Sequence, residues 1–362
     1  MNQIGNLTAP ADATIWRDSE ELECCSVVPE APNAATFSFA ALSGALFRFQ
    51  PGQFVTLGVP VPGGSVWRTY TLSSSPSRPL TISVTAKAQK GSIGTRWMLD
   101  NLRPGMRIRA MGPAGIFTLP KAERKKYLFI SAGSGVTPSL SMTTYLFDRG
   151  TAIDATLIVC AKSPRDIIGR NHLESLASRV PGIKLNFIVE EDDPFQVWTG
   201  FRGRLNQIMI GLIAGDYLDR EIYCCGPGPF MDAVHEMLID LGYDMSRYQQ
   251  EAFTGPPVET EAEQEAPDDL VPDGTARSHV PFAASGVGAD CTETDTVLAI
   301  ARAAGLNIPS GCTFGVCGTC KVRKISGEVH MVHNGGISVE DIGAGYILAC
   351  CSEPIGTVSV DI

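Results

Sequence analysis

Residues 21–120 carry their apolar positions in short runs that Pro and Gly separate. Several runs alternate apolar and polar residues, the period that brings every second side chain of a β-strand to one face. Short strands joined by tight turns are typical of an antiparallel β-barrel. One stretch, residues 95–102, has helical spacing instead and ends before Pro104 and Gly105. The expected strands are 22–28, 35–40, 54–59, 67–72, 81–86 and 107–111.

The pattern changes in residues 121–253, where apolar runs alternate with longer stretches of helical spacing. Strands that alternate with helices predict a parallel sheet, because each crossover between parallel strands needs a connection of about helix length. We therefore expect a doubly wound nucleotide-binding domain. Its strands are expected at 127–131, 156–161, 184–189 and 222–225, and its helices at 138–149, 171–179 and 229–241.

Residues 254–278 are acidic and rich in Pro, with few large apolar side chains. A segment of this composition buries too little surface to fold alone, so we expect an extended linker. A compact domain is expected at 279–362, with strands at 280–284 and 321–325 and a helix at 296–304. Residues 1–20 show no regular pattern and are expected to form an N-terminal extension.

The composition is that of an ordinary globular protein, with 44% hydrophobic and 19% charged residues in a chain of 362. No run approaches about eighteen consecutive apolar residues, and the first residues lack the basic start and apolar core of a signal peptide. These features favour a cytoplasmic protein without a membrane partner.

The formal charge of −10 is concentrated behind residue 253. Residues 1–253 carry 24 acidic and 24 basic side chains, residues 254–282 carry seven and one, and residues 283–362 carry eight and four. Nucleic acid is excluded as a partner, because phosphate binding needs a clustered basic surface. The acidic C-terminal part favours a protein partner with a basic docking patch.

Three cysteines, Cys312, Cys317 and Cys320, follow the spacing C-x4-C-x2-C, and Cys350 lies further along the chain. This is the plant-type ligand pattern of a [2Fe–2S] cluster, in which four thiolates hold two irons. Zinc sites use paired C-x2-C segments, of which this chain has one, and disulfides need an oxidising compartment. The pattern therefore predicts that these four cysteines are cluster ligands.

The strand expected at 67–72 contains Arg68, Thr69, Tyr70 and Thr71. Alternation along a strand places Arg68 and Tyr70 on one face and Thr71 on the other. The run resembles the flavin-binding signature R-x-Y-[ST] of the ferredoxin–NADP reductase superfamily. The resemblance implies that this strand, Thr69 included, binds the flavin: Arg68 at a phosphate, Tyr70 stacked on the isoalloxazine, and Thr71 near N5. A planar guanidinium suits a phosphate and an aromatic face suits a flat ring.

Gly91, Gly94 and Thr95 lie at the start of the helix expected at 95–102. A helix N-terminus with small residues offers free amides to an anion. The resemblance implies a flavin pyrophosphate against Gly94 and Thr95, although the family usually has Ser where this chain has Thr95. A pyrophosphate favours FAD over FMN, which some relatives with a C-terminal iron–sulfur domain use.

A glycine-rich turn joins the first strand and helix of the nucleotide domain. It resembles the superfamily's loop G-G-x-G-[IV]-T-P, with Ala132 in place of the first glycine. Glycines in such a turn let phosphate or ribose lie against the backbone. The resemblance implies that Gly133, Gly135 and Thr137 bind NAD.

Cys225, Gly226 and Pro227 follow the last expected strand of this domain and resemble the superfamily's C-G-P segment beside the nicotinamide. Cys225 is expected to shape the hydride path and not to act as a nucleophile. Glu251 and Phe253 resemble the family's E-x-F ending, whose acid and aromatic ring lie close to the flavin. The residues expected to be catalytic are Cys225, Thr71 and Glu251.

Ser163 and Arg165 follow the second strand of the nucleotide domain. Either side chain could receive a 2′-phosphate, but the run that begins at Ser163 also resembles NADH-using relatives. On that resemblance NADH is the expected donor, with Ser163 and Arg165 among the residues that bind it.

The segment 279–362 resembles the plant-type ferredoxin family, which implies a β-grasp fold. That family places the fourth ligand directly after a Leu-Ala pair, and this selects Cys350 over its neighbour Cys351. Cys351 is expected to point the other way if the segment is extended.

A hydride carrier delivers electrons in pairs and an iron–sulfur cluster accepts them singly, so a flavin must stand between the two. The expected path runs from NADH to FAD to the [2Fe–2S] cluster and then to an external acceptor. The domain order resembles the reductase components of Rieske-type oxygenases that N-demethylate quaternary amines such as glycine betaine, stachydrine or carnitine. Two alternatives stay open: an NADH reductase of a hybrid-cluster protein, and an electron carrier without pyridine-nucleotide activity, which the replacement at Ala132 suggests.

Overall fold

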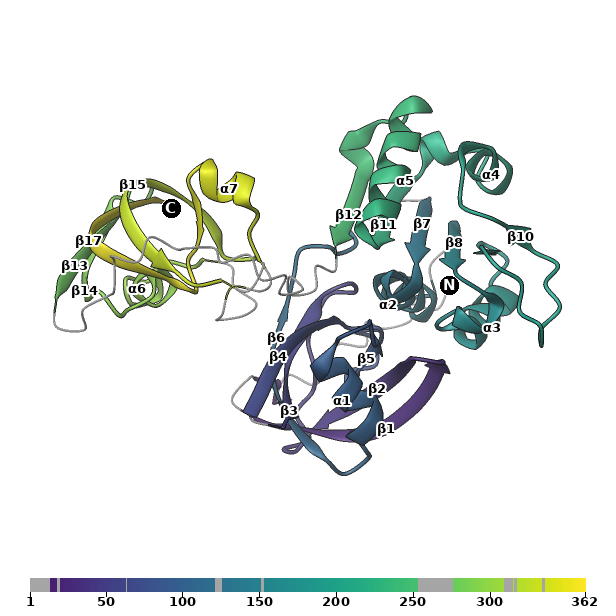
Figure 1. The fold of residues 1–362 in the computed structure, drawn as a ribbon, viewed down its shortest axis with the longest axis horizontal. Helices are drawn as coiled ribbons and strands as arrows, with labels where there is room; N and C mark the ends of the chain where they lie inside the picture. Colours follow the sequence, from purple (N-terminus) through teal and green to yellow (C-terminus); the bar gives the residue numbers. More distant parts are fainter. Residues whose placement is uncertain are drawn as a thin grey trace, which may run out of the picture. The chain divides into compact units, whose positions relative to one another are not determined.

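The computed structural model describes residues 14–17, 20–62, 64–120, 126–150, 153–252, 276–308, 315, 318–333 and 336–362. The chain divides into two units, Met1–Phe253 and Thr254–Ile362, and each is described by itself. Of the three sheets in the described residues, two lie in the first unit and one in the second (Figure 1). Within the described residues, no helix is long and apolar enough to cross a membrane.

The first sheet is antiparallel and runs in the order β4-β3-β6-β1-β2-β5. An antiparallel bridge between Leu72, just after β4, and Val84 of β5 brings the two outer strands together, so the sheet closes into the expected barrel. Each strand predicted from the apolar runs forms. The strands are β1 (Leu22–Ala31), β2 (Ala34–Ala41), β3 (Phe54–Val61), β4 (Gly64–Thr71), β5 (Ile82–Lys87) and β6 (Arg107–Ala114).

The barrel core is built from the apolar positions of these strands, including Phe37 of β2. Helix α1 (Ile93–Asn101) packs against β3 and buries Met98 in the same core. Trp16, in the expected N-terminal extension, is also buried and packs on Phe47 with ring centroids 5.5 Å apart. The barrel core therefore includes residues that precede β1.

The second sheet is entirely parallel and runs in the order β10-β9-β8-β7-β11-β12. The strand order reverses between β7 and β11, and ligands of such sheets bind in the crevice outside the carboxyl ends of the strands at this reversal. The strands are β7 (Tyr127–Ala132), β8 (Ala155–Ala161), β9 (Ile183–Val189), β10 (Phe201–Arg202), β11 (Glu221–Gly226) and β12 (Tyr248–Ala252).

Helices cover both faces of this sheet (Figure 1), which makes it doubly wound as expected. Alternation along β11 sends Tyr223 and Cys225 into the core with α2 and α3, and Cys224 into the core with α5. The short β10, the polar β12 and α4 were not predicted, because none has a clear apolar period. The helices are α2 (Val136–Asp148), α3 (Arg170–Arg179), α4 (Gln207–Ile213) and α5 (Gly228–Asp240).

Polar contacts join the barrel to the parallel sheet within the first unit. Ser141 on α2 donates a hydrogen bond of 2.7 Å to the carbonyl of Ser74, and Arg78 forms a 2.8 Å ion pair with Asp148 at the end of α2. Strand β5 also lies close to the turn Gly133–Gly135 that follows β7. The segment between β4 and β5 is thereby held against α2, and β5 lies close to the turn that precedes this helix.

The second unit contains a mixed sheet in the order β14-β13-β17-β15-β16, in which β13 and β17 are parallel and the other pairs are antiparallel. Helix α6 (Val297–Ala303) packs against β13, β14 and β17, in agreement with the expected β-grasp arrangement. Here β14, β16, β17 and α7 were not predicted, because Pro and Gly interrupt β17, β14 has few apolar residues, and β16 and α7 are short. The remaining elements are β13 (Arg277–Phe282), β14 (Val287–Thr292), β15 (Lys321–Met331), α7 (Val339–Gly343), β16 (Tyr346–Leu348) and β17 (Ser352–Asp361).

Candidate functional site

Arg68 on β4 lies against the start of α1. A Cβ built on Gly94 would lie 2.9 Å from Val66 Cγ2 and 3.3 Å from Arg68 Cγ, so only glycine allows this approach. Arg68 Nη1 donates a hydrogen bond of 2.8 Å to the carbonyl of Trp67. Among the described residues, no carboxylate forms an ion pair with Arg68. Its charge is therefore available to an anion.

The N-terminus of α1 has no side-chain cap. Ser92 occupies the N-cap position without making a capping bond, and the first turn contains no acidic residue. The Ser92 hydroxyl is buried and has no hydrogen-bond partner in the part of the chain that the structure describes. An unpaired buried polar group costs about 1–3 kcal/mol, and the first amides of a helix attract anions. Arg68, Ser92, Gly94 and Thr95, here called the flavin cradle, thus fit a diphosphate.

Tyr70 connects β4 to the flavin cradle. Its hydroxyl shares a hydrogen bond of 2.9 Å with Thr95 Oγ1, and burial raises the pKa of Tyr70, so that the phenol stays neutral. Thr69 Oγ1 shares a 3.1 Å hydrogen bond with Thr56 Oγ1 on β3, and Thr71 is buried at the end of β4. The structure thus brings Tyr70 and Thr95 together and gives Thr69 a partner inside the barrel sheet.

The turn after β7 is shaped by its glycines. Gly133 has a φ of +55°, which favours glycine. A Cβ built on Gly135 would lie 2.2 Å from the carbonyl oxygen of Cys225, so this turn touches the end of β11. Ala132 ends β7 with φ −132° and ψ 132°, an extended conformation that any residue adopts. The replacement of the family's first glycine by alanine therefore leaves the turn intact.

The segment after β11 completes the crevice at the strand reversal. Gly226 allows close packing, because a Cβ there would lie 2.8 Å from Phe230 Cδ1 and 3.1 Å from Ala132 Cβ. Pro227 is the N-cap residue of α5. Thr137 donates a hydrogen bond of 3.0 Å to the carbonyl of Ser134 and so holds the facing turn. The predicted NAD-binding residues of the two turns are brought together.

Cys225 and Glu251 are paired neighbours on the parallel strands β11 and β12. Burial raises the pKa of the Cys225 thiol well above its ordinary value, and the Glu251 carboxyl adds to the rise. Burial raises the pKa of Glu251 to about 8, and its Oε2 has no hydrogen-bond partner within the described residues. The thiol is therefore a neutral group, not a nucleophile, and Glu251 holds a proton at neutral pH. Phe253 lies outside the described residues.

Ser163 and Arg165 lie at the carboxyl end of β8, and both already have carboxylate partners. Ser163 donates a hydrogen bond of 2.6 Å to Asp166 Oδ2. Arg165 Nε lies 3.3 Å from Oδ2 of Asp193, a buried residue that follows β9. The two predicted residues are therefore near each other, but neither side chain is free.

Two of the predicted cluster ligands, Cys320 and Cys350, are buried in one core. The backbone N–H of Cys350 donates to Cys320 Sγ at 3.4 Å. Amides that point at sulfur stabilise thiolate charge, so this pair fits an iron–sulfur cluster. A Cβ on Gly318, whose φ is +69°, would lie 2.7 Å from the carbonyl oxygen of Gly336, and glycine lets the ligand loop curl. Cys312 and Cys317 lie outside the described residues.

Cys351 departs from the expectation for an extended segment. Residues 349 and 350 form a turn, and the Cys351 N–H donates a 3.1 Å hydrogen bond to the carbonyl of Leu348. A Cβ built on Gly315 would lie 2.8 Å from Cys351 Sγ, so this sulfur lies against the ligand loop instead of pointing away. The turn removes the alternation on which the expectation rested.

Sequence reasoning missed two features of the site. The buried Ser92 hydroxyl lies within the small-residue run that precedes α1, and the signal was its position one residue before the helix. Asp193 lies in the acidic run after β9 and meets Arg165 because β8 and β9 are paired. An acidic run that follows a buried parallel strand was the available signal.

Three family models match the chain in sequence order. They are an oxidoreductase FAD-binding domain at residues 26–119, an oxidoreductase NAD-binding domain at 129–236, and a 2Fe-2S iron-sulfur cluster binding domain at 282–354. These models agree with the flavin cradle, the crevice at the strand reversal, and the contact between Cys320 and Cys350. Together they define an oxidoreductase that passes electrons from NADH through FAD to a [2Fe–2S] cluster. The match to an oxidoreductase NAD-binding domain favours this path over the alternative of an electron carrier without pyridine-nucleotide activity.

The stachydrine N-demethylase reductase subunit of Rhizobium meliloti (strain 1021) is 60% identical over 348 residues, which cover 96% of this chain and 98% of that protein. The glycine betaine monooxygenase reductase subunit of Pseudomonas aeruginosa (strain UCBPP-PA14) is 43% identical over 365 residues, 98% of this chain and 99% of that protein. The chain belongs to this family of flavin and iron–sulfur reductase subunits.

A solved structure of phthalate dioxygenase reductase has the same architecture. It superimposes with a TM-score of 0.58 at 22% identity, over 94% of this chain and 97% of that chain. At this identity the likeness shows the fold: an antiparallel flavin domain, a parallel nucleotide domain and a C-terminal mixed sheet.

Proposed function

We propose that this chain is the reductase of a Rieske-type oxygenase that N-demethylates a quaternary amine, with stachydrine favoured over glycine betaine. The observation that carries the proposal is the 60% identity to a stachydrine N-demethylase reductase subunit, against 43% to a glycine betaine monooxygenase reductase subunit. The reaction balances as NADH, O₂, a proton and an N-methyl group giving NAD⁺, water, formaldehyde and the demethylated amine. The two electrons from NADH reduce the O₂ that oxidises the methyl carbon.

In this proposal the flavin cradle holds FAD by its pyrophosphate. Arg68 supplies the charge, the amides at Gly94 and Thr95 and the Ser92 hydroxyl supply hydrogen bonds, and Tyr70 lies beside them through its bond to Thr95. Thr69 and Thr71 complete the flavin-facing strand. When bound, FAD accepts a hydride and releases electrons one at a time.

The dinucleotide lies in the crevice between β7 and β11. Gly133, Gly135 and Thr137 bind the phosphates and ribose, since the turn is glycine-shaped and its Thr137 hydroxyl is held by the turn itself. Gly226 and Pro227 close the opposite wall. Because β5 of the barrel lies close to the turn after β7, a nicotinamide in this crevice is directed toward the flavin domain.

Cys225 and Glu251 form the neutral wall of this crevice. A neutral thiol fills space beside the nicotinamide without attacking it, and a protonated Glu251 places no negative charge where two electrons arrive. Both groups thus favour hydride transfer at neutral pH by keeping the site uncharged. Glu251 also retains a proton that it can donate.

Electrons leave through the C-terminal unit. Cys312, Cys317, Cys320 and Cys350 hold the cluster in this proposal, supported by the contact between the Cys350 amide and the Cys320 sulfur. The excess of acidic residues behind residue 253 suits an oxygenase with a basic docking patch. We place the protein in the cytoplasm, supported by the free cysteines Cys24, Cys25, Cys160, Cys224 and Cys225 and by thiolate cluster ligation.

The test is reconstitution with purified oxygenase components. The chain, NADH and O₂ are combined with the oxygenase of a stachydrine demethylase or of a glycine betaine monooxygenase, each with its own amine. We expect formaldehyde release with both oxygenases. The stachydrine enzyme should release it faster and should need a lower reductase concentration. No formaldehyde with either oxygenase, while NADH still reduces a dye acceptor, would contradict the assignment of the partner.

A further inference from the structure

The carboxyl ends of β8, β9 and β10 form one continuous edge beside the crevice. Strand β8 adjoins β7, and the ladder runs on through β9 to β10. Neighbouring strands lie about 4.8 Å apart, so the ends of β8 and β9 lie about 5 and 10 Å from the end of β7. A dinucleotide with its nicotinamide at β11 and its phosphates at β7 extends its adenosine half along this edge.

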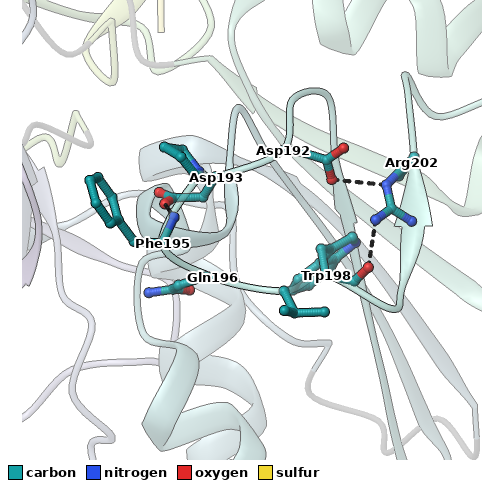
Figure 2. A pocket seen from close by; sticks show the side chains of 8 residues that line it. Asp192, Asp193, Phe195, Gln196, Trp198 and Arg202 are labelled. Atoms are coloured by element: carbon teal, nitrogen blue, oxygen red, sulfur yellow. Dashed lines mark hydrogen bonds and ion pairs between the residues drawn. The ribbon is translucent and has the colours of Figure 1, made fainter.

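Each basic side chain placed on this edge has an acidic partner. The ion pairs are Lys162–Glu191 at 3.6 Å, Arg165–Asp193 at 3.3 Å, Arg202–Asp192 at 3.0 Å and Arg204–Glu190 at 3.7 Å. We call these eight residues the paired edge. Figure 2 shows Asp192 reaching Arg202 in the loop after β9, where residues 192–198 and Arg202 line an open cleft of about 330 Å³.

The Arg165–Asp193 pair differs from the other three in the burial of its acid, while the Arg165 side chain is 57% exposed. The Asp193 side chain is 2% exposed, whereas every other acid of the paired edge is at least half exposed. Asp193 Oδ1 also accepts a hydrogen bond of 2.8 Å from the Phe195 backbone N–H, which fixes the carboxylate. A fixed, buried carboxylate is a stronger partner than a mobile exposed one, because water screens it less.

Lys162 and Arg165 are the basic side chains of the turn directly after β8, the position at which a dinucleotide's 2′ substituent is read. An acidic residue there accepts a bond from a 2′-hydroxyl, whereas a free arginine accommodates a 2′-phosphate. Here Ser163 donates to Asp166, and Arg165 is held by Asp193. A 2′-phosphate would meet paired cations and carboxylates, while a 2′-hydroxyl needs no free cation.

We infer that Asp193, by holding Arg165, is the residue that makes this reductase select NADH over NADPH. It is a positioning residue, because it acts through Arg165 and does not itself contact the ribose. The inference rests on the proposed placement of the dinucleotide at β7 and β11.

The variant Asp193→Asn tests the inference, because its side-chain oxygen still accepts from the Phe195 amide while the charge that holds Arg165 is gone. We expect kcat/KM for flavin reduction by NADPH to rise about tenfold or more, as expected for a new charge-assisted hydrogen bond, with little change for NADH. Calorimetry gives a second readout: 2′-phospho-ADP-ribose should bind tighter, whereas ADP-ribose should bind as before.

Two further variants decide how the gain arises. Asp192→Asn removes an equal charge from the same loop but leaves Arg165 held, so we expect a much smaller gain. Adding Arg165→Ala to Asp193→Asn should abolish the gain. Equal gains from Asp192→Asn and Asp193→Asn, or a gain that survives without Arg165, would overturn the inference. Undiminished ADP-ribose binding by Gly135→Ala would instead show that the placement of the dinucleotide is wrong.

Discussion

The flavin cradle and the paired edge both offer cations, and they differ in how those cations are partnered. Among the described residues, Arg68 has no carboxylate partner and the buried Ser92 hydroxyl at the start of α1 has no hydrogen-bond partner. On the paired edge, each of four cations has an acid within 3.7 Å. The first surface is incomplete without an anion, and the second is already neutral.

This difference explains how the first unit can bind FAD tightly and also discriminate between NADH and NADPH. A cation without a partner gains a charge-assisted hydrogen bond when phosphate arrives. A cation with a carboxylate partner must first give up that partner, so the phosphate gains little. At Arg165 the partner to be given up is the buried carboxylate of Asp193.

The variant Arg68→Ala removes the cation of the flavin cradle. Loss of this guanidinium should weaken flavin binding by about 100-fold, because hydrogen bonds to charged groups contribute about 1.5–3 kcal/mol each. The flavin absorbance that remains after dialysis measures the effect. Arg96→Ala is the matched control, since Arg96 already pairs with Asp100 at 2.7 Å. Equal flavin retention by the two variants would remove Arg68 from the phosphate site.

A methyl group at Gly135 should disrupt the crevice between β7 and β11. The new Cβ in Gly135→Ala would lie 2.2 Å from the Cys225 carbonyl oxygen and must push the two turns apart. We expect flavin reduction by NADH to slow at least about tenfold while flavin content is kept. Stopped-flow absorbance follows the step. Gly228→Ala, where a Cβ meets no atom within 4 Å, should behave as the unmodified protein. A normal rate in Gly135→Ala would count against binding in this crevice.

The protonation of Glu251 should set the pH dependence of flavin reduction. Its pKa of about 8 lies above the ordinary carboxyl value, so the proton is held at neutral pH and lost as the pH rises through about 8. An ionised carboxylate disfavours the arrival of a hydride, and the rate of flavin reduction should therefore fall a few-fold between pH 7 and 9.

The variant Glu251→Gln keeps a neutral side chain of the same shape and should make the rate independent of pH over this range. Exposed Glu236 on α5 supplies the control, and Glu236→Gln should keep the fall. Rates measured across the range in both variants check the assignment. A fall of the same size in Glu251→Gln would assign the titration to another group.

Much of the fold could be predicted because the strands of the first unit have strong periods. Buried and less buried positions alternate in β2, and β7 is an almost continuous apolar run between helical stretches. Strand β12, Tyr-Gln-Gln-Glu-Ala, carries no such signal and is a strand only because it pairs with β11. Two-residue β10 depends on β9 in the same way.

In the candidate site, too, features carried by local sequence could be predicted and features created by tertiary pairing could not. Motifs named Arg68, Gly135 and Cys225, because their chemistry is carried by neighbouring residues in the sequence. The Arg165–Asp193 pair joins the ends of two parallel strands, and the turn at Cys351 depends on its bond to Leu348. Features that tertiary pairing creates could not be found from spacing alone.

The most direct test of the account is anaerobic mixing with NADH of the full protein and of Cys350→Ser, followed at flavin and cluster wavelengths. If electrons pass from NADH through FAD to the cluster, flavin bleaches first in both proteins and the cluster bleaches afterwards in the unmodified protein alone. Cluster reduction without prior flavin reduction, or flavin that stays oxidised in the unmodified protein, would contradict the path from NADH through FAD to the cluster.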